Sequence, residues 1–176
     1  MQLAVFNSVD RSDVINVLRP CLDIQRWVEH IADARPFDSL DSLLGFARET
    51  AEPFTPQEVA EALKHHPRIG ERPKAQTTEA AMSRSEQAGV DPADNDVATA
   101  LTDGNREYEA KFGRVFLIRA AGRTATEILA SLRERLTHTP EEEDAIVAAQ
   151  LREIALLRLA SVVSDADVIS EGATSK

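Results

Sequence analysis

Residues 139–161 read TPEEEDAIVAAQLREIALLRLAS, and they carry the clearest helical signal in the chain. Thr139 supplies a capping hydroxyl, Pro140 suits the first helical position, and Glu142 completes a capping box at the third. Apolar residues then recur at helical spacing, and the expected buried stripe is Ile146, Ala149, Ile154 and Leu157. We therefore expect a long amphipathic helix here.

Other segments carry the same kind of signal. Residues 55–58, Thr-Pro-Gln-Glu, repeat the arrangement at 139–142, and residues 124–127, Thr-Ala-Thr-Glu, form a capping box without the proline. Helical spacing also marks residues 12–22 and 25–34, and a further apolar stripe lies in 40–47. Each segment is expected to form a helix with one buried face.

Residues 115–121, VFLIRAA, alone resemble a strand. A single strand has no partner for its backbone groups, so we expect an extended, buried connector and infer no sheet. Residues 71–80 are polar and are expected to form a loop. The fold prediction is all-α: one compact helical domain over residues 1–164 and a polar, flexible tail over 165–176.

Composition limits the classes of function. The chain has 176 residues, of which 43% are hydrophobic and 28% charged, as in soluble globular proteins. No apolar run approaches the ~20 residues of a membrane span. The formal charge of −10 argues against nucleic acid as a partner, because phosphate binding needs an excess of Lys and Arg.

The cytoplasm is the expected compartment. Cys21 is a lone cysteine and so forms no internal disulfide, which fits a reducing environment. Residues 1–10 lack the pattern of a secretion signal, and the ending Thr174-Ser175-Lys176 is not a peroxisomal address. We expect no membrane association.

Several common catalytic motifs are absent from the sequence. There is no Gly-rich phosphate loop and no GxSxG elbow. No metal site is expected, because none of the four histidines has metal-ligand spacing to a second His or Cys. These histidines are His30, His65, His66 and His138.

The segment His65-His66-Pro67-Arg68-Ile69-Gly70 is the first candidate for chemistry. Pro67 should end the helix that begins at Thr55, which places His66 at a rigid helix exit. Histidine titrates near neutrality and can give or take a proton there. The alternative is that one histidine of the pair only contacts the carbonyls at the helix end.

Two further places are candidates. Ser83 and Glu86 match a capping box, and a helix start at this point would also present N–H groups that bind anions. Arg158 is expected on or beside a stripe of Ile154, Leu157 and Ser161. Its guanidinium then either reaches the rim of the protein or points into a pocket to meet an anion.

Taken together, these residues resemble the OHCU decarboxylases, enzymes of 2-oxo-4-hydroxy-4-carboxy-5-ureidoimidazoline. The resemblance extends over about residues 6–160. The matching pieces are Phe6-Asn7-Ser8, Trp27, Arg35-Pro36-Phe37, His66-Pro67-Arg68-Ile69-Gly70, Glu86-Gln87-Ala88-Gly89, Asn105-x-x-Tyr108-x-x-Lys111-Phe112-Gly113-x-Val115-Phe116, Gly122-Arg123 and Ile154-x-x-x-Arg158-Leu159.

The resemblance implies a single all-helical domain, usually a homodimer, that converts OHCU to (S)-allantoin and CO2 without a cofactor. It implies that His66 donates the proton, that Glu86 is an active-site carboxylate and that Arg158 binds a carboxylate. The substrate contacts that it implies are Pro67, Ser83, Arg84, Ser85 and Gln87, and the main chain of Phe116, Leu117, Ile118, Arg119 and Ala120.

Two alternatives remain at this point. The chain is either an enzyme for another ureido or imidazole substrate on the same fold, or a non-enzymatic helical interaction module. In a module, His66, Glu86 and Arg158 would be a helix-end, a capping and a surface residue, and they need not meet in space.

Overall fold

A computed structural model describes residues 1–64, 66–71, 76–90 and 95–165. Over these residues the chain is helical and contains no strand, so the all-α prediction is confirmed. The predicted tail lies, apart from Asp165, outside the described residues. The elements are α1 (Leu3–Ser8), α2 (Arg11–Leu18), α3 (Gln25–Asp33), α4 (Leu40–Thr50), α5 (Pro56–Leu63), α6 (Thr78–Glu86), the short 3₁₀ helix η1 (Ala88–Val90), α7 (Asn95–Phe112), α8 (Ala125–Arg135) and α9 (Pro140–Val162).

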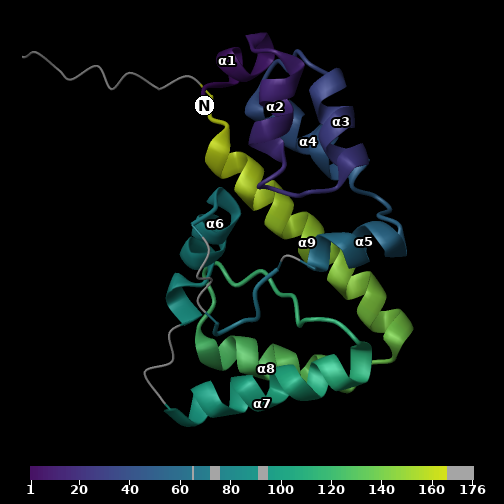
Figure 1. Cartoon of the computed structure of the whole chain (residues 1–176), viewed down its shortest axis with the longest axis vertical. Helices are drawn as coiled ribbons and strands as arrows, with labels where there is room; N and C mark the ends of the chain where they lie inside the picture. Colours follow the sequence, from purple (N-terminus) through teal and green to yellow (C-terminus); the bar gives the residue numbers. More distant parts are fainter. Residues whose placement is uncertain (65, 72–75, 91–94, 166–176) are drawn as a thin grey trace, which may run out of the picture.

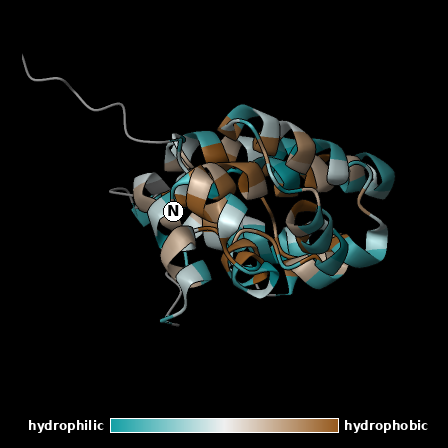
Figure 2. Cartoon of the chain, turned by 90° about the horizontal axis from the view of Figure 1, so that it is seen from above, coloured by the Kyte–Doolittle hydropathy of each residue, from teal (hydrophilic) through white to brown (hydrophobic). Residues whose placement is uncertain are grey.

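The helices form two groups joined by α9 (Figure 1). Helices α1 to α4 gather at one end of the molecule, α7 and α8 lie side by side at the other, and α9 runs from one group to the other. Helix α6 and the connector, residues 115–121, lie between the groups. Hydrophobic residues concentrate in the middle of the molecule and hydrophilic ones on its outer helices (Figure 2).

Each group has its own hydrophobic core. The first core joins α1 to α5 with α9, and its largest fully buried side chains are Phe6, Leu18, Trp27, Ile31, Leu43, Leu151 and Leu159. The second core consists of Ile69, Leu101, Tyr108, Phe116, Ile118, Ala120, Ala125, Ile128, Leu129 and Leu132. The two cores are separate clusters. A segment that runs between them must therefore pack apolar side chains against each core.

The connector contacts both cores by alternating its side chains between them. Successive side chains of an extended chain point to opposite sides. Leu117 accordingly packs in the first core, whereas Phe116, Ile118 and Ala120 pack in the second. The strand-like sequence therefore reflects burial on both sides of a single segment.

Most helix starts agree with the sequence. The hydroxyls of Thr55, Thr124 and Thr139 each accept from the backbone of the third helical residue, and all three capping boxes are complete. The prediction failed for α6, which begins at Thr78 inside the expected loop. Its capping residue is Thr77, whose side chain accepts from the Ala80 backbone.

The expected stripe on α9 was also partly wrong. Leu157 is 38% exposed and Ser161 is exposed, while Ile154 is buried as predicted. The stripe that faces the interior is Glu143, Val147, Leu151, Ile154 and Arg158. The predicted stripe differs from the observed one because the buried stripe carries a charged residue at each end. A search for apolar residues does not include these two charged positions.

The Arg26–Glu58 pair predicts an acid-sensitive contribution to stability. Hydrogen bonds from Arg26 of 2.8 and 2.9 Å lower the pKa of Glu58 from 4.5 to about 2. Because this pKa is depressed by folding, the stabilisation is present above pH 4.5 and is lost as the pH falls through 2.

A Glu58→Gln variant keeps the capping box but removes the charge. We expect it to lose about 0.5–1 kcal/mol at pH 7. This difference from the parent should shrink between pH 4.5 and pH 2, as measured by urea unfolding. A difference that stays constant over this pH interval would contradict the assignment.

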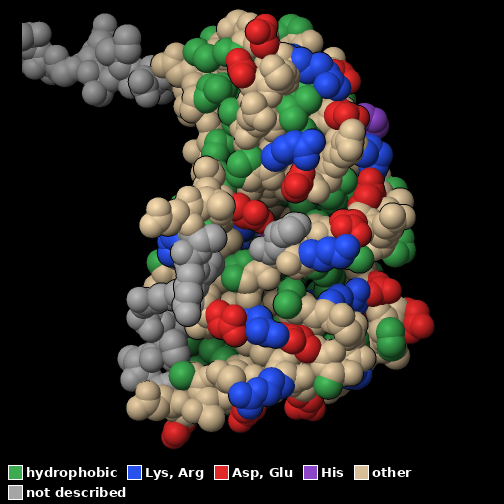
Figure 3. Space-filling model, viewed as in Figure 1, with side chains coloured by type: hydrophobic (Ala, Val, Ile, Leu, Met, Phe, Trp, Pro, Cys, Tyr) green, Lys and Arg blue, Asp and Glu red, His purple; other side chains and the backbone are tan. Residues whose placement is uncertain are grey.

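The surface facing the viewer in Figure 3 carries acidic and basic side chains interspersed, with no continuous patch of one sign. None of the helices described combines the length and apolar character needed to cross a bilayer.

Candidate active site

The His66 loop, residues 66–70, leaves the end of α5. The His66 backbone donates to the Leu63 carbonyl at 3.1 Å. The helix ends at Leu63, four residues before Pro67 and earlier than predicted. The loop is then held by side chains from other helices. Asn105 of α7 donates to the Ile69 carbonyl at 3.0 Å, and the Gly70 backbone donates to the Gln87 side chain at 3.0 Å.

This loop forms one wall of a cleft between the two cores. The cleft is narrow and encloses about 20 Å³. The end of α6 and the connector form the other walls, and α9 contributes its middle. The lining residues are His66, Pro67, Ile69, Glu86, Gln87, Phe116, Leu117, Ile118, Ala120 and Ile154.

Arg158 stands behind Glu86 and ties α9 to α6. Only 3% of its side chain is exposed, so it does not reach the rim of the protein. It donates to both Glu86 oxygens, at 2.6 and 2.9 Å, and to the Ser83 hydroxyl at 3.0 Å. A fourth, longer bond of 3.3 Å reaches the Pro20 carbonyl. The buried guanidinium thus has the anionic partner that its burial requires.

The capping prediction for Ser83 and Glu86 is wrong. Both residues lie in the last turns of α6, not at its start, so no free N–H groups of a helix start are found there. Residues three apart share a helix face, and this face is the one that meets Arg158. The Ser-x-x-Glu spacing is therefore explained by the ion pair and not by a cap.

The structure brings most of the predicted site residues together. His66, Pro67, Glu86, Gln87 and four of the five predicted connector residues line the cleft. Arg158 does not line the cleft but donates to Glu86 and to Ser83. Arg84 and Ser85 are exposed on α6 and are not among the lining residues. His65 lies outside the described residues.

The connector obtains its backbone partners from side chains, a feature that the sequence analysis missed. Arg135 of α8 donates to the Leu117 carbonyl at 2.7 Å, and the Arg119 backbone donates to the Gln150 side chain at 2.8 Å. The guanidinium of Arg135 also lies 4.6 Å from the centre of the Phe116 ring. These two side chains replace the neighbouring strand that the connector lacks.

Arg135 belongs to a buried network with Glu143, Tyr108 and His138. It donates to Glu143 at 2.8 Å through Nε, the Tyr108 hydroxyl donates to the same carboxylate, and His138 lies 3.2 Å from its other oxygen. Burial and the nearby carboxylate raise the pKa of Tyr108 to about 12. Burial opposes ionisation of Glu143, but the bonds from Arg135 and Tyr108 outweigh it and lower the pKa.

Sequence patterns gave little warning of this network. Glu143 stands in a run of acidic residues in the first turn of α9, where exposed carboxylates are common. Tyr108 was visible only as part of a family motif, because its position on α7 is not marked by any local rule.

Cys21 is a poor candidate for a nucleophile. It is 1% exposed, and burial raises the pKa of its thiol to about 12. The thiolate that nucleophilic catalysis needs is therefore scarce at neutral pH. Among the described residues, no group of three His, Cys, Asp or Glu side chains is placed to hold a metal ion.

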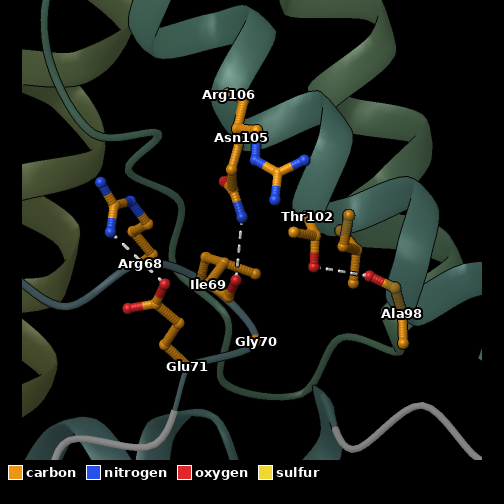
Figure 4. A pocket seen from close by; sticks show the side chains of 9 residues that line it. Arg68, Ile69, Gly70, Glu71, Ala98, Thr102, Asn105 and Arg106 are labelled. Carbon is orange, nitrogen blue, oxygen red and sulfur yellow. Dashed lines mark hydrogen bonds and ion pairs between the residues drawn. The ribbon is translucent and has the colours of Figure 1, made fainter.

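A second pocket shares Ile69 with the cleft (Figure 4). It encloses about 320 Å³, and Arg68, Thr102, Asn105 and Arg106 contribute to its walls. Its arginines already have carboxylate partners: Arg68 donates to Glu109 at 2.9 Å, and Arg106 to Asp103 at 3.1 Å. Arg158 beside the cleft is likewise paired, with Glu86, so the cleft is distinguished from this pocket by His66, a residue type that can transfer a proton.

Comparison with known proteins agrees with this geometry. The chain is 26% identical over 168 residues to the uric acid degradation bifunctional protein of Bacillus sp. (strain TB-90), covering 95% of this chain and 33% of that protein. It is 24% identical over 161 residues to the 2-oxo-4-hydroxy-4-carboxy-5-ureidoimidazoline decarboxylase of Haloferax volcanii, covering 91% and 95%. The chain thus spans about a third of the bifunctional relative's length.

Among solved structures, the fold is similar to that of an OHCU decarboxylase crystallised in the presence of (S)-allantoin. The TM-score is 0.69 at 24% identity, over 88% of this chain and 98% of the other. At this identity, the likeness establishes the fold alone. The family model described as OHCU decarboxylase matches residues 7–160, which is most of the sequence. The chain therefore belongs to the OHCU decarboxylase family.

Proposed function

We propose that this chain decarboxylates OHCU to (S)-allantoin and CO2, a step in urate degradation. The observation that carries the proposal is the single cleft in which His66, Glu86 and the connector meet, with Arg158 fixed to Glu86. An interaction module has no reason to bring these residues together, so their convergence counts against that alternative.

The chemistry of the substrate explains why proton transfer suffices. The carboxylate of OHCU is bonded to a carbon next to a conjugated ring carbonyl and imine. When the bond to CO2 breaks, its electron pair passes into the adjacent imine and leaves an enol. The enol hydroxyl then loses its proton to become the ring carbonyl of allantoin, and a proton adds to the neighbouring carbon, which bears the ureido group. The protein must orient the carboxylate, stabilise the charge that develops in the ring and protonate one face.

His66 is the proton donor in this proposal. It lines the cleft, is only partly exposed, and is held at the exit of α5 by Pro67. A proton delivered from a fixed wall reaches one face of the planar intermediate, which gives a single enantiomer. Positioned acids of this kind contribute typically 10²- to 10⁴-fold to a rate.

In this proposal Glu86 orients the substrate and His66, and Arg158 holds the Glu86 carboxylate in place. The two bonds from the guanidinium fix the plane of the carboxylate, so that its remaining lone pairs face the cleft. A direct grip of Arg158 on a substrate carboxylate would require the substrate to share the guanidinium with Glu86, and it stays a prediction. The connector offers backbone groups on the opposite wall.

We also propose that the protein is a homodimer of the cytoplasm. The resemblance supports the dimer, and the lone buried Cys21 fits a reducing compartment. Sedimentation equilibrium of the purified chain, 19.3 kDa as a monomer, tests the dimer directly.

Circular dichroism of the product tests the activity. OHCU is made fresh from urate with a urate oxidase and a 5-hydroxyisourate hydrolase, and this protein is then added. Rapid growth of the (S)-allantoin signal with release of CO2 is the expected result. OHCU also decays spontaneously to racemic allantoin, so a trace that matches decay without protein would refute the proposal and favour a related ureido or imidazole substrate.

A further inference from the structure

Five polar or charged residues are buried among the described residues, and none of them lines the cleft. They are Ser83, Asn105, Arg135, Glu143 and Arg158. Burial of a polar group is unfavourable unless it gains partners, so such groups mark places where position matters. Arg158, which also donates to Ser83, binds Glu86, and Arg135, which also donates to Glu143, binds the connector. Asn105 remains, and its partner is the His66 loop.

Asn105 reaches the loop from α7, as Figure 4 shows. Its side-chain amide donates to the Ile69 carbonyl at 3.0 Å, and the residue is 5% exposed. Its Oδ1 has no hydrogen-bond partner among the described residues, so the bond to Ile69 is the polar contact that explains this amide. Ile69 itself lines the cleft, three residues after His66.

The loop has a second tie to α7, because Arg68 donates to Glu109 at 2.5 and 2.9 Å. It lacks the repeating backbone bonds of a helix or sheet, and Gly70 turns it back with φ +86°. Gln87 accepts from the Gly70 backbone on the cleft side, while Asn105 donates to Ile69 on the other. These opposed bonds fix the plane of the Ile69–Gly70 peptide and, through Pro67, the approach of His66.

We propose that Asn105 is a positioning residue that sets the place of His66 in the cleft. This inference rests on the proposed function for its effect on catalysis, but the restraint on the loop stands independently of the substrate. Loss of the bond lets the loop move relative to Glu86 without removing any group that touches the substrate.

The test compares Asn105→Leu with Thr102→Val on the same helix. Leucine matches asparagine in size but cannot donate to Ile69. Thr102 lines the same pocket, is exposed and bonds within its own helix to the Ala98 carbonyl at 3.0 Å, so its substitution is a matched control. In Asn105→Leu we expect kcat to fall about 10- to 100-fold, because small displacements of a reacting group have effects of this size.

Two further readouts separate positioning from a general loss of structure. KM should stay within about threefold, because the groups that bind the ground state remain. Hydrogen–deuterium exchange of residues 66–71 should quicken at least about tenfold, while exchange in α7 and α8 stays as in the parent. Asn105→Gln, which keeps a donor and has room in the adjoining pocket, should recover part of kcat.

The proposal is overturned if Asn105→Leu folds and matches Thr102→Val in both kcat and exchange of the loop. If Asn105→Leu does not fold, the parent chain still decides: the Asn105 side-chain amide protons, followed by nitrogen-15 NMR, must exchange more slowly than those of exposed Asn16. Equal exchange would refute the restraint. An inactive parent with a protected Asn105 amide would refute the proposed function alone.

Discussion

His66→Gln is expected to fold like the parent chain and to lose about 10²- to 10⁴-fold in kcat for OHCU decarboxylation. Glutamine is close to histidine in size and still forms hydrogen bonds, but it does not titrate near neutrality. Substrate binding should therefore persist while proton delivery fails. The measurement is the initial rate of the (S)-allantoin dichroism signal, corrected for spontaneous decay of OHCU, together with the enantiomeric purity of the product.

His30→Gln provides the matched control, because His30 is exposed on α3 and lies far along the chain from the cleft. We expect this variant to behave as the parent does. Normal turnover and pure (S)-allantoin from His66→Gln would mean that another group, with Glu86 the first candidate, delivers the proton.

The parts of the fold that were predictable rest on local chemistry. A threonine hydroxyl and a glutamate three residues on favour a helix start when a helical apolar stripe follows, and the starts at Thr55, Thr124 and Thr139 were found for that reason. The start of α6 at Thr78 was missed because the segment before it is polar and carries a weak pattern. The same capping rule, applied to Ser83 and Glu86, gave a false helix start.

The parts of the site that depend on local backbone geometry were predictable from the sequence. The parts that depend on contacts between residues far apart in the sequence were not. Pro67 places His66 at a helix exit by local geometry alone. The partnership of Glu86 with Arg158 joins residues 72 positions apart, and no spacing rule anticipates it. The support for the connector was hidden for the same reason, since Arg135, Gln150 and Glu143 act only through the tertiary fold.

Arg135→Leu should cause the largest loss of stability, about 3–5 kcal/mol. The substitution leaves the Glu143 carboxylate fully buried without its cation and leaves the Leu117 carbonyl without its donor. A buried, uncompensated charge is far less favourable than the intact pair. For a chain of this size, each kcal/mol lowers the melting temperature by about 2–4 °C, so a fall of roughly 6–20 °C is expected in a thermal melt.

Arg133→Leu is the matched control, because Arg133 lies two residues before Arg135 on the same helix and is exposed. It should change stability by less than about 0.5 kcal/mol. The deficit of Arg135→Leu relative to this control should shrink as the pH falls from 7 towards 4, since burial without Arg135 raises the pKa of Glu143 and protonation then removes the buried charge.

A double substitution separates the charge from the packing. Arg135→Leu with Glu143→Leu removes both charges, and such replacements are often neutral or stabilising, so it should regain much of the lost stability. It should not regain activity, because the Leu117 carbonyl still lacks its donor. The connector, which forms one wall of the cleft, is then no longer held in position. Recovery of both stability and activity would mean that the network stabilises the fold without shaping the cleft. Recovery of stability alone would mean that these buried charges are retained for the position of the active-site wall.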